Sequence, residues 1–456
     1  MLDTQNLAPS QGKRLPATQE EMRALAELAL NHARTLGASA TEVEVSASLG
    51  QTVTVRMREV ETIEHNRDKG LSITVYFGQQ RGSASTSDFA RAAIERTVAA
   101  ACTIAKYTAA DEFAGLADPD QLAREPIPDL HLYEPWPVTV EEAIRLATET
   151  EAAAFAVDKR IDNSEGATLS TEESNFIYAN SNGFMAGYPT SRASLSASVI
   201  ATSGDAMQRD YWFTTARGAA GIESPEAVGR KAGERCVARL GARRIGTCVI
   251  PVLFDPNMAS GLISQFVSAV SGSSLYRKAS FLLDSLGKPV FSSSVTLREE
   301  PHLPGGLASG YFDAEGVATR TRDVVRDGAV CGYFLGSYSA RKLGMQTTGN
   351  AGGNHNLILQ PGEHDLPGLL RKMQRGLLVT ELMGQGVNGV TGDYSRGAVG
   401  FWVEGGEIQF PVEEVTIAGN LKDMYRNIVA VGNDVLVTGS RQTGSILVES
   451  MAIAGD

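Results

Sequence analysis

The stretch EVEVSASLGQTVTVRMREVETIEHNRDKGLSITVYFG, residues 42–78, decides the architecture of the first part of the chain. Apolar and polar residues alternate within EVEVSAS, TVTVRMREVETIEH and LSITVYFG, and Gly50 and Gly70 separate these runs. A period of two places successive side chains on opposite faces of a strand. The stretch therefore predicts an antiparallel meander with breaks at the two glycines, and RGSASTS at 81–87 can add a short fourth strand.

Helical patterns flank this meander. Thr18 and Glu21 have the spacing of a capping box, and the apolar residues that follow trace one helical face until Gly37. Asp88 opens a second amphipathic stretch that is suited to cover the sheet. We therefore expect a unit of helix, meander and helix over 18–108, preceded by a disordered tail over 1–17.

The rest of the chain predicts two further parts. Residues 109–137 contain five prolines and no sustained periodicity, which favours an extended connection. A second unit with the same order of elements is expected over 138–244, and glycine-punctuated strands predict a larger β-rich domain over 245–456. The expected fold class is α+β, with two N-terminal helix, antiparallel-meander and helix units followed by the β-rich C-terminal domain.

Composition and charge restrict the classes of molecule that the chain is expected to bind. The chain has 456 residues and a net charge of −12, which opposes direct binding to nucleic acid or to an anionic membrane. The four cysteines form no C-x-x-C pair, and no apolar run reaches the length of a membrane span. We expect a cytoplasmic protein that has neither a disulfide framework nor a zinc ribbon.

One glycine-rich stretch, LMGQGVNGVTGDYSRGAVGFWV at 382–403, raises two alternatives. Gly384, Gly386 and Gly389 have the spacing of a dinucleotide-binding fingerprint, but strand-like alternation follows them where a helix is required. The other interpretation is a groove in which glycines let a peptide backbone approach closely. The polar residues that could line such a groove are Asp393, Tyr394, Ser395 and Arg396. A plain turn, in which Asp393 binds its own backbone, explains these residues equally well.

Histidines and basic residues give fewer indications. No two of the six histidines have metal-ligand spacing, so a self-contained zinc site is not predicted. His355 lies in TTGNAGGNHN at 347–356, where a functional loop or a solvated loop could carry it. The groups Tyr276–Lys278 and Tyr338–Lys342 contain basic side chains that fit a solvated surface or a contact with a partner.

Long segments resemble the TldD/PmbA family, and within it the PmbA (TldE) branch. They are SLYRKASFLLDSLGK at 274–288, TTGNAGGNHN at 347–356, VTELMGQGVNGVTGDYSRGAVGFWVEGGEIQFPVEEVTIAGNL at 379–421 and VGND at 431–434. The resemblance implies a chain that pairs with a TldD-type subunit in a heterodimeric zinc metalloprotease. It also implies extended peptide substrates such as microcin precursors and antitoxins, and an older association with modulation of DNA gyrase.

The same resemblance locates a metal site that this chain lacks. Catalytic members carry H-E-x-x-x-H on a helix and a further cysteine ligand near the C-terminus. The corresponding positions here are Gln265, Phe266, Val270 and Thr443, so the ligands and the general base are absent. We therefore expect no cofactor in this chain and zinc in the TldD-type partner.

The resulting hypothesis is a non-catalytic protease subunit, which could form a homodimer when it is alone. Two alternatives stay open: a stand-alone peptide hydrolase with an unrecognised site, and a binding or scaffold protein that modulates a toxin or gyrase pathway. The candidate peptide groove comprises Gly384, Gly386, Gly389, Asp393, Tyr394, Ser395, Arg396 and His355.

Overall fold

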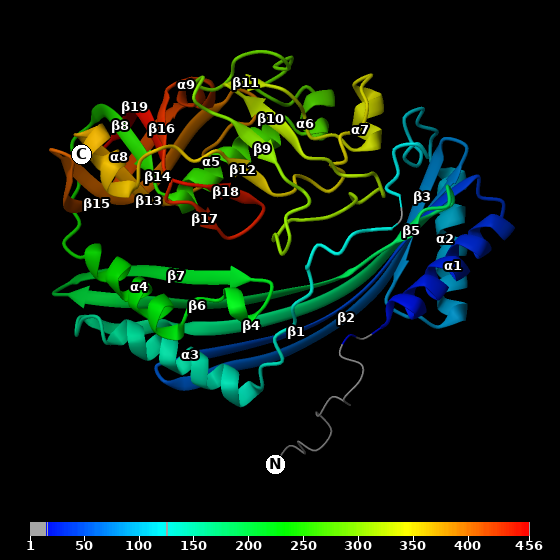
Figure 1. Ribbon diagram of the computed structural model, residues 1–456, viewed down its shortest axis with the longest axis horizontal. Helices are drawn as coiled ribbons and strands as arrows, with labels where there is room; N and C mark the ends of the chain where they lie inside the picture. Colours follow the sequence, from blue (N-terminus) through cyan, green and yellow to red (C-terminus); the bar gives the residue numbers. More distant parts are fainter. Residues whose placement is uncertain (1–14, 16, 125, 456) are drawn as a thin grey trace.

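A computed structural model describes residues 15, 17–124 and 126–455, and Figure 1 shows how their helices and strands are arranged. The fold is mixed α and β, as the sequence predicts. The predicted tail at 1–17 lies almost wholly outside the described residues. The helices are α1 (Gln19–Thr35), α2 (Arg91–Tyr107), α3 (Val140–Phe155), α4 (Pro225–Ala238), α5 (Pro256–Ala269), α6 (Gly272–Tyr276), α7 (Ser337–Lys342), α8 (Leu366–Met373), α9 (Leu421–Arg426) and the 3-10 turn η2 (Ala219–Gly221).

The two N-terminal units share a single seven-stranded sheet with the order β3-β2-β1-β4-β6-β7, in which β5 pairs with β4. The central ladder joins the units, because β1 pairs with β4 in antiparallel register from Glu42–Asn180 to Val55–Ala167. The strands are β1 (Ala40–Arg56), β2 (Glu59–Phe77), β3 (Gln80–Thr86), β4 (Ile161–Asn180), β5 (Met185–Ala186), β6 (Pro189–Ser203) and β7 (Ala206–Ala216).

The breaks that we predicted at Gly50 and Gly70 are wrong, because both glycines lie inside long strands. The chain turns instead at Met57 and Arg58, whose φ angles are 52° and 66°. The fully buried Glu151 of α3 accepts the backbone N–H groups of Met57 at 2.9 Å and of Arg58 at 2.8 Å. A carboxylate distant in sequence therefore holds a turn for which glycine or asparagine is the usual local signal.

Four helices cover one face of this curved sheet, and the C-terminal domain lies over the other face (Figure 1). Helices α1 and α2 pack on the end that contains β3, whereas α3 and α4 pack on β4, β6 and β7. The predicted cap of α1 is present, because the Thr18 hydroxyl accepts from the backbone N–H of Glu21, and the Thr139 hydroxyl caps α3 by accepting from the backbone N–H of Glu142. Amphipathic helices with fixed starting points thus bury the apolar face of the sheet.

The C-terminal domain contains two six-stranded sheets, with orders β11-β10-β9-β12-β18-β17 and β15-β14-β13-β8-β19-β16. Helix α5 packs against β8 and β13 of one sheet and against β18 of the other, and so lies at the centre of the main core. The strands are β8 (Cys248–Phe254), β9 (Leu297–Glu299), β10 (Arg322–Arg326), β11 (Ala329–Val330), β12 (Leu357–Leu359), β13 (Gly376–Met383), β14 (Asp393–Glu404), β15 (Glu407–Asn420), β16 (Ile428–Val431), β17 (Leu436–Val437), β18 (Arg441–Thr443) and β19 (Ile446–Ala454).

A cluster of ion pairs links α4 to the C-terminal domain. Arg239, nearly buried at the end of α4, pairs with Glu381 of β13. Arg235 lies 3.2 Å from Asp210 and 3.7 Å from Asp255, the N-cap of α5. Burial raises the pKa of Asp255 to about 6. In the described part of the chain, no helix is both long and apolar enough to cross a membrane.

Candidate functional site

The positions at which the family resemblance implies metal ligands and a base lie on or at the end of α5 and on β18, two elements that pack together. Gln265 is half-buried, whereas Phe266 and Val270 are completely buried in the main apolar core. The Phe266 ring lies edge-on to Phe291, with 4.9 Å between centroids. The position of the expected general base is therefore filled by an aromatic ring packed against other aromatic rings.

Thr443, at the position of the expected cysteine ligand, is buried on β18, and its hydroxyl donates to the carbonyl of Gly444 at 2.7 Å. Among the described residues, no group of three or more His, Cys, Asp or Glu side chains lies close enough to hold a metal ion. An amide, a hydroxyl and two apolar side chains cannot replace histidine and thiolate ligands for zinc. The residues present at this place do not fit a catalytic metal.

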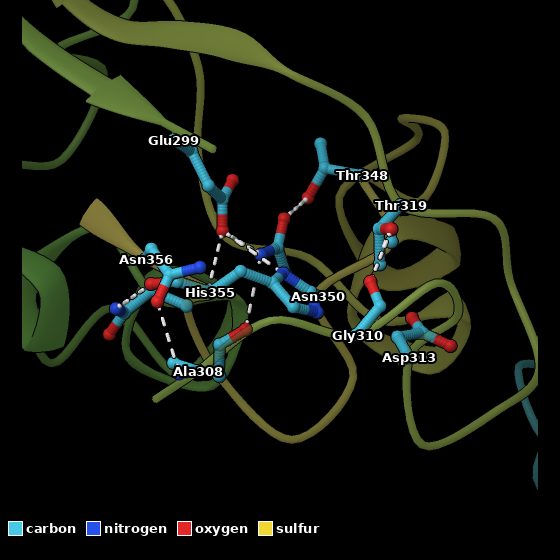
Figure 2. A network of polar contacts seen from close by, with 12 residues as sticks. Glu299, Ala308, Gly310, Asp313, Thr319, Thr348, Asn350, His355 and Asn356 are labelled. Atoms are coloured by element: carbon cyan, nitrogen blue, oxygen red, sulfur yellow. Dashed lines mark hydrogen bonds and ion pairs between the residues drawn. The ribbon is translucent and has the colours of Figure 1, made fainter. Parts of the chain in front are cut away.

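His355 belongs to a buried polar network built around Glu299 at the end of β9 (Figure 2). Glu299 is 1% exposed, and one of its carboxylate oxygens accepts from the Asn350 amide at 2.7 Å and from the His355 backbone N–H at 2.8 Å. Its other oxygen accepts from the Arg322 guanidinium at 2.8 Å. The carboxylate of Glu299 on β9 thus fixes the irregular segment 350–356.

The charges in this network offset the burial of the carboxylate. Burial alone raises the pKa of Glu299. The hydrogen bonds from His355 and the charge of Arg322 lower this pKa by a larger amount, so it lies below its ordinary value. The His355 ring is 13% exposed, with its Nδ1 3.3 Å from Glu299. These contacts assign His355 a partner inside the protein and leave only a small part of its ring accessible.

Asp313 and Asn356 fix the two ends of the same loop. Asp313 accepts the backbone N–H groups of Glu315, Val317 and Ala351 at 2.9–3.0 Å, and burial raises its pKa to about 6. Asn356, fully buried, accepts from the Ala308 N–H at 3.0 Å and donates to the Glu300 carbonyl at 2.8 Å. In an irregular buried segment the backbone N–H and C=O groups have no regular backbone partners. The side chains of Asp313 and Asn356 supply hydrogen-bond partners for these groups.

The loop at 350–356 also adjoins the strand that carries Thr443. The Asn354 amide donates to the Ser440 carbonyl at 3.3 Å, and β12 pairs in parallel with β18. The structure therefore places the loop next to the start of β18, whereas Thr443 lies at the other end of this strand, level with Leu359.

The second candidate region is the hairpin between β13 and β14, residues 384–396. No helix follows Gly389, so the requirement for a dinucleotide fingerprint is not met, as the sequence predicts. A Cβ atom added to Gly386 would lie 1.8 Å from the Ser395 carbonyl oxygen, whereas a Cβ atom at Gly389 would have no neighbour within 4 Å. Gly384 has a φ of 78°, which favours glycine. The three glycines thus differ: Gly386 is required by a close contact, Gly384 by its positive φ angle, and Gly389 by neither.

The polar residues of the hairpin also differ. The Asp393 carboxylate accepts from the Thr391 hydroxyl at 2.6 Å and from the Asn420 amide at 3.1 Å, so its partners are other side chains and not its own backbone. Tyr394 is buried, and burial raises its pKa to about 12. Ser395 is exposed, and Arg396 donates to the Leu382 carbonyl at 3.3 Å. Within the described residues, no hydrogen bond or ion pair joins this hairpin to the loop at 350–356.

The basic residues of α7 have a structural role. The Arg341 guanidinium donates to the carbonyl groups of Phe113, Gly115 and Leu116, and Lys342 lies 4.3 Å from the centre of the Phe113 ring. The Tyr338 hydroxyl donates to Asp111 at 2.7 Å. These residues hold the connection between the N-terminal units against the C-terminal domain, a role that the sequence does not indicate.

One pocket was not predicted. It has a volume of about 260 Å³, lies between the N-terminal sheet and the C-terminal domain, and is lined partly by Glu42, Arg81 and Glu315. The Glu42 carboxylate accepts from the hydroxyls of Tyr76 at 3.0 Å and Tyr178 at 2.9 Å, and burial raises its pKa. The residues that line this pocket come from separate segments between Glu42 and Ala351, so no local pattern could have identified the pocket.

Three family models match the chain. PmbA/TldA metallopeptidase domain 1 matches residues 41–105, the central domain matches 133–240 and the C-terminal domain matches 247–455. The chain is 49% identical to Metalloprotease PmbA of Escherichia coli O157:H7, over 91% of this chain and 92% of that protein. It is 47% identical to the Metalloprotease PmbA homolog of Haemophilus influenzae, over 97% and 98% of the two chains.

Solved structures agree. A candidate modulator of DNA gyrase from Bacteroides thetaiotaomicron superposes with a TM-score of 0.90 at 30% identity, covering 95% of this chain and 99% of that one. TldE from Thermococcus kodakarensis has the same fold, with a TM-score of 0.83 at 21% identity over 95% and 100% of the two chains. Sequence and fold lead to the same conclusion: the chain belongs to the PmbA/TldD metallopeptidase family.

Proposed function

We propose that this chain is the non-catalytic subunit of a heterodimeric zinc metalloprotease, in which a TldD-type partner holds the metal. The observation that carries the proposal is the burial of Phe266 and Val270 in the apolar core of α5, at positions where catalytic relatives are expected to have a base and a ligand. A carboxylate at Phe266 would be buried among aromatic rings, which disfavours its charged form strongly. The packing around α5 is thus suited to a helix that carries no catalytic group.

The remaining contribution of such a subunit is to bind and enclose the substrate. Extended peptides, of the kind found in microcin precursors and antitoxins, present free backbone N–H and C=O groups that can pair with exposed backbone. The hairpin at 384–396 offers exposed positions at Gly384, Gly389 and Ser395. The loop at 350–356 is fixed by more buried contacts than the hairpin. It would form a wall beside the peptide and take no part in catalysis.

The first experiment measures metal and activity in three samples: this chain alone, the TldD-type subunit alone, and the two coexpressed. We expect the isolated chain to purify without stoichiometric zinc and to leave an unfolded peptide intact, while the coexpressed pair cleaves it. About one tightly held zinc per isolated chain, with cleavage that a chelator abolishes, would contradict the proposal and favour a stand-alone hydrolase.

The second experiment tests the partnership itself. Size-exclusion chromatography of the two subunits mixed at micromolar concentrations should give one peak of the summed mass, because a subunit without its own metal affects proteolysis only by assembly. Two separate peaks, together with full activity of the TldD-type subunit alone, would instead favour a binding or scaffold protein with a different target.

A further inference from the structure

The pocket between the N-terminal sheet and the C-terminal domain has an acidic inner end. Two carboxylates, Glu42 and Glu315, line it together with Tyr76, Tyr178 and Tyr338. Tyr76 is 4% exposed and Tyr178 is 5% exposed, and their hydroxyls donate to Glu42 at 3.0 Å and 2.9 Å. These contacts fix the Glu42 carboxylate in a cavity of about 260 Å³, which is large enough for a small organic group.

Glu315 brings a second carboxylate to the pocket from the C-terminal domain. One of its oxygens accepts from the backbone N–H of Ser337, the first residue of α7, at 2.8 Å. Burial raises the pKa of Glu42, and the negative charge of Glu315 raises it further. The two carboxylates come from opposite sides of the domain interface, and they are close enough to repel each other.

The basic residue that lines the pocket does not offset this repulsion. Arg81 of β3 is exposed, and its charge lowers the pKa of Glu42 less than the charge of Glu315 raises it. Across the part of the chain that the structure describes, Glu42 and Glu315 accept hydrogen bonds from neutral groups, and neither forms an ion pair. A cation that enters between the two carboxylates would stabilise both of their charged forms.

The lining of the pocket fits an organic cation better than a bare metal ion. A metal ion requires several ligands around it at short distances, and the described residues contain no group of three or more His, Cys, Asp or Glu side chains that could hold one. The pocket offers hydroxyl groups instead, at Ser72, Thr74 and the tyrosines. An alkylammonium ion has three N–H donors for carboxylates and hydroxyls, and the faces of aromatic rings attract its charge.

We propose that this pocket binds a primary alkylammonium group, with Glu42 and Glu315 as the acceptors and the tyrosines as the walls. Such a group occurs on small free amines and at the N-terminus of a peptide. The exposed Arg81 repels a cation that enters, and so it limits the affinity. The proposal concerns a site on this chain alone and does not rest on the proposed proteolytic role.

Isothermal titration calorimetry of the full chain with butylammonium chloride, at constant ionic strength, tests the site directly. We expect saturable binding to one site per chain with a Kd in the millimolar range, because the probe is small. Butanol has nearly the same shape but no charge, and it should not bind measurably. Equal binding of the two probes, or no saturable binding of butylammonium up to about 100 mM, overturns the proposal.

Two variants should change the affinity for butylammonium in opposite directions. Glu315→Gln removes the charge but keeps an oxygen that can accept from Ser337, and it should weaken binding at least about tenfold. Arg81→Gln removes an exposed repulsive charge and should strengthen binding about two- to threefold. A general loss of folding cannot produce both changes, and melting temperatures near that of the wild type would verify that the variants fold.

Glu413→Gln is the matched control for Glu315→Gln. Glu413 is half-buried on β15, at the opposite end of the molecule from α7 (Figure 1), and it accepts from the Gln208 amide at 2.7 Å. This variant should bind butylammonium as the wild type does. If Glu315→Gln also binds as the wild type does, the cation lies elsewhere and the proposal is wrong.

A short peptide without lysine, prepared with a free and with an acetylated N-terminus, identifies the source of the ammonium group. Binding of the free form that acetylation abolishes supports the site and assigns it to a peptide N-terminus. Failure of both peptides, together with binding of butylammonium, supports the site and assigns it to small free amines. Equal binding of the two peptides in competition with butylammonium contradicts the proposal, because the pocket would then not require a charge.

Discussion

The loop at 350–356 and the hairpin at 384–396 have similar compositions but different structures. Both are rich in glycine and polar residues, and both were candidates to line a peptide groove. The loop is organised by buried side chains from other elements, chiefly Glu299 and Asp313. The hairpin is organised by contacts within itself and with Asn420, and by a distant backbone contact, in which the Phe281 N–H donates to the Gly389 carbonyl at 3.0 Å. Buried side chains from distant elements therefore fix the loop, whereas the hairpin, within the described chain, has only a backbone contact from such an element.

The difference has a functional meaning. A segment whose polar groups are already satisfied inside the protein is a rigid support, whereas a segment with exposed backbone can pair with a ligand. Of the two regions, the hairpin is the better candidate for peptide contact and the loop is the better candidate for structural support.

The largest expected effect is the loss of Glu299. Glu299→Ala removes the acceptor for Asn350 and His355 and leaves the Arg322 guanidinium without its buried partner. Removing one partner of a buried ion pair costs about 3–5 kcal/mol. We expect a loss of this size in the free energy of unfolding, measured by chemical denaturation.

Glu300→Ala is the matched control for this change. Glu300 is the next residue in the chain, its side chain is 23% exposed, and its ion-pair partner Arg298 is 52% exposed. We expect a loss of less than about 1 kcal/mol for this variant. Equal losses for the two variants would show that the network around Glu299 does not stabilise the loop.

The second prediction separates two glycines within the hairpin. Gly386→Val places a side chain on the Ser395 carbonyl oxygen, so the hairpin must open, and we expect a destabilisation of about 2–3 kcal/mol. Gly389→Val meets no atom within 4 Å and should leave the melting temperature near that of the wild type. Differential scanning calorimetry of the two variants measures this contrast.

The same pair of variants tests the groove. If a peptide backbone passes close to Gly389, Gly389→Val should lower cleavage by the assembled complex at least about tenfold, with assembly and stability unchanged. Unchanged cleavage would show that Gly389 does not line the groove and that this glycine only shapes the turn of the hairpin. Gly386→Val cannot decide this question, because its effect on folding comes first.

The third prediction concerns pH. Burial raises the pKa of Asp313 from 3.8 to about 6, so between these values the folded protein holds a proton that the unfolded chain does not. The contribution of Asp313 to stability is therefore greatest at low pH and falls by about 1–2 kcal/mol as the pH rises toward 6. Asp393 behaves oppositely: the hydrogen bonds from Thr391 and Asn420 lower its pKa, so its contribution is lost only as the pH falls below 3.8.

Hydrogen exchange of the two segments between these pH values, corrected for intrinsic rates, tests the third prediction. Amides of the loop at 350–356 should lose protection as the pH rises, and those of the hairpin should not. Asp313→Asn should remove the pH dependence in the loop. A pH dependence that persists in this variant would assign it to another group.

Local signals in the sequence were sufficient for much of the fold. The capping residues Thr18 and Thr139 mark the starts of α1 and α3, and alternation marks the strands. The β1–β2 turn could not be predicted, because the group that stabilises Met57 and Arg58 is Glu151, on a helix of the second unit. The continuity of the sheet was missed for a similar reason, since strand pairing between units leaves no local trace.

The candidate sites show the same limit. The family resemblance implies the positions of the metal ligands and the base, and the residue types at Gln265, Phe266, Val270 and Thr443 predict that these groups are missing. The part played by Glu299 could not be predicted, because one glutamate in a short strand has no distinctive pattern. The reason for Gly386 likewise depends on the carbonyl of Ser395, which only the folded hairpin brings near.

The shared sheet also has a consequence for synthesis on the ribosome. The β1 strand cannot complete its second ladder until β4 has emerged, on the order of a hundred residues later. At a translation rate of roughly 5–20 residues per second, β1 keeps an open edge for about ten seconds. The nascent first unit therefore exposes both sides of its meander during this interval, and a chain that stalls before residue 160 would stay in this aggregation-prone state.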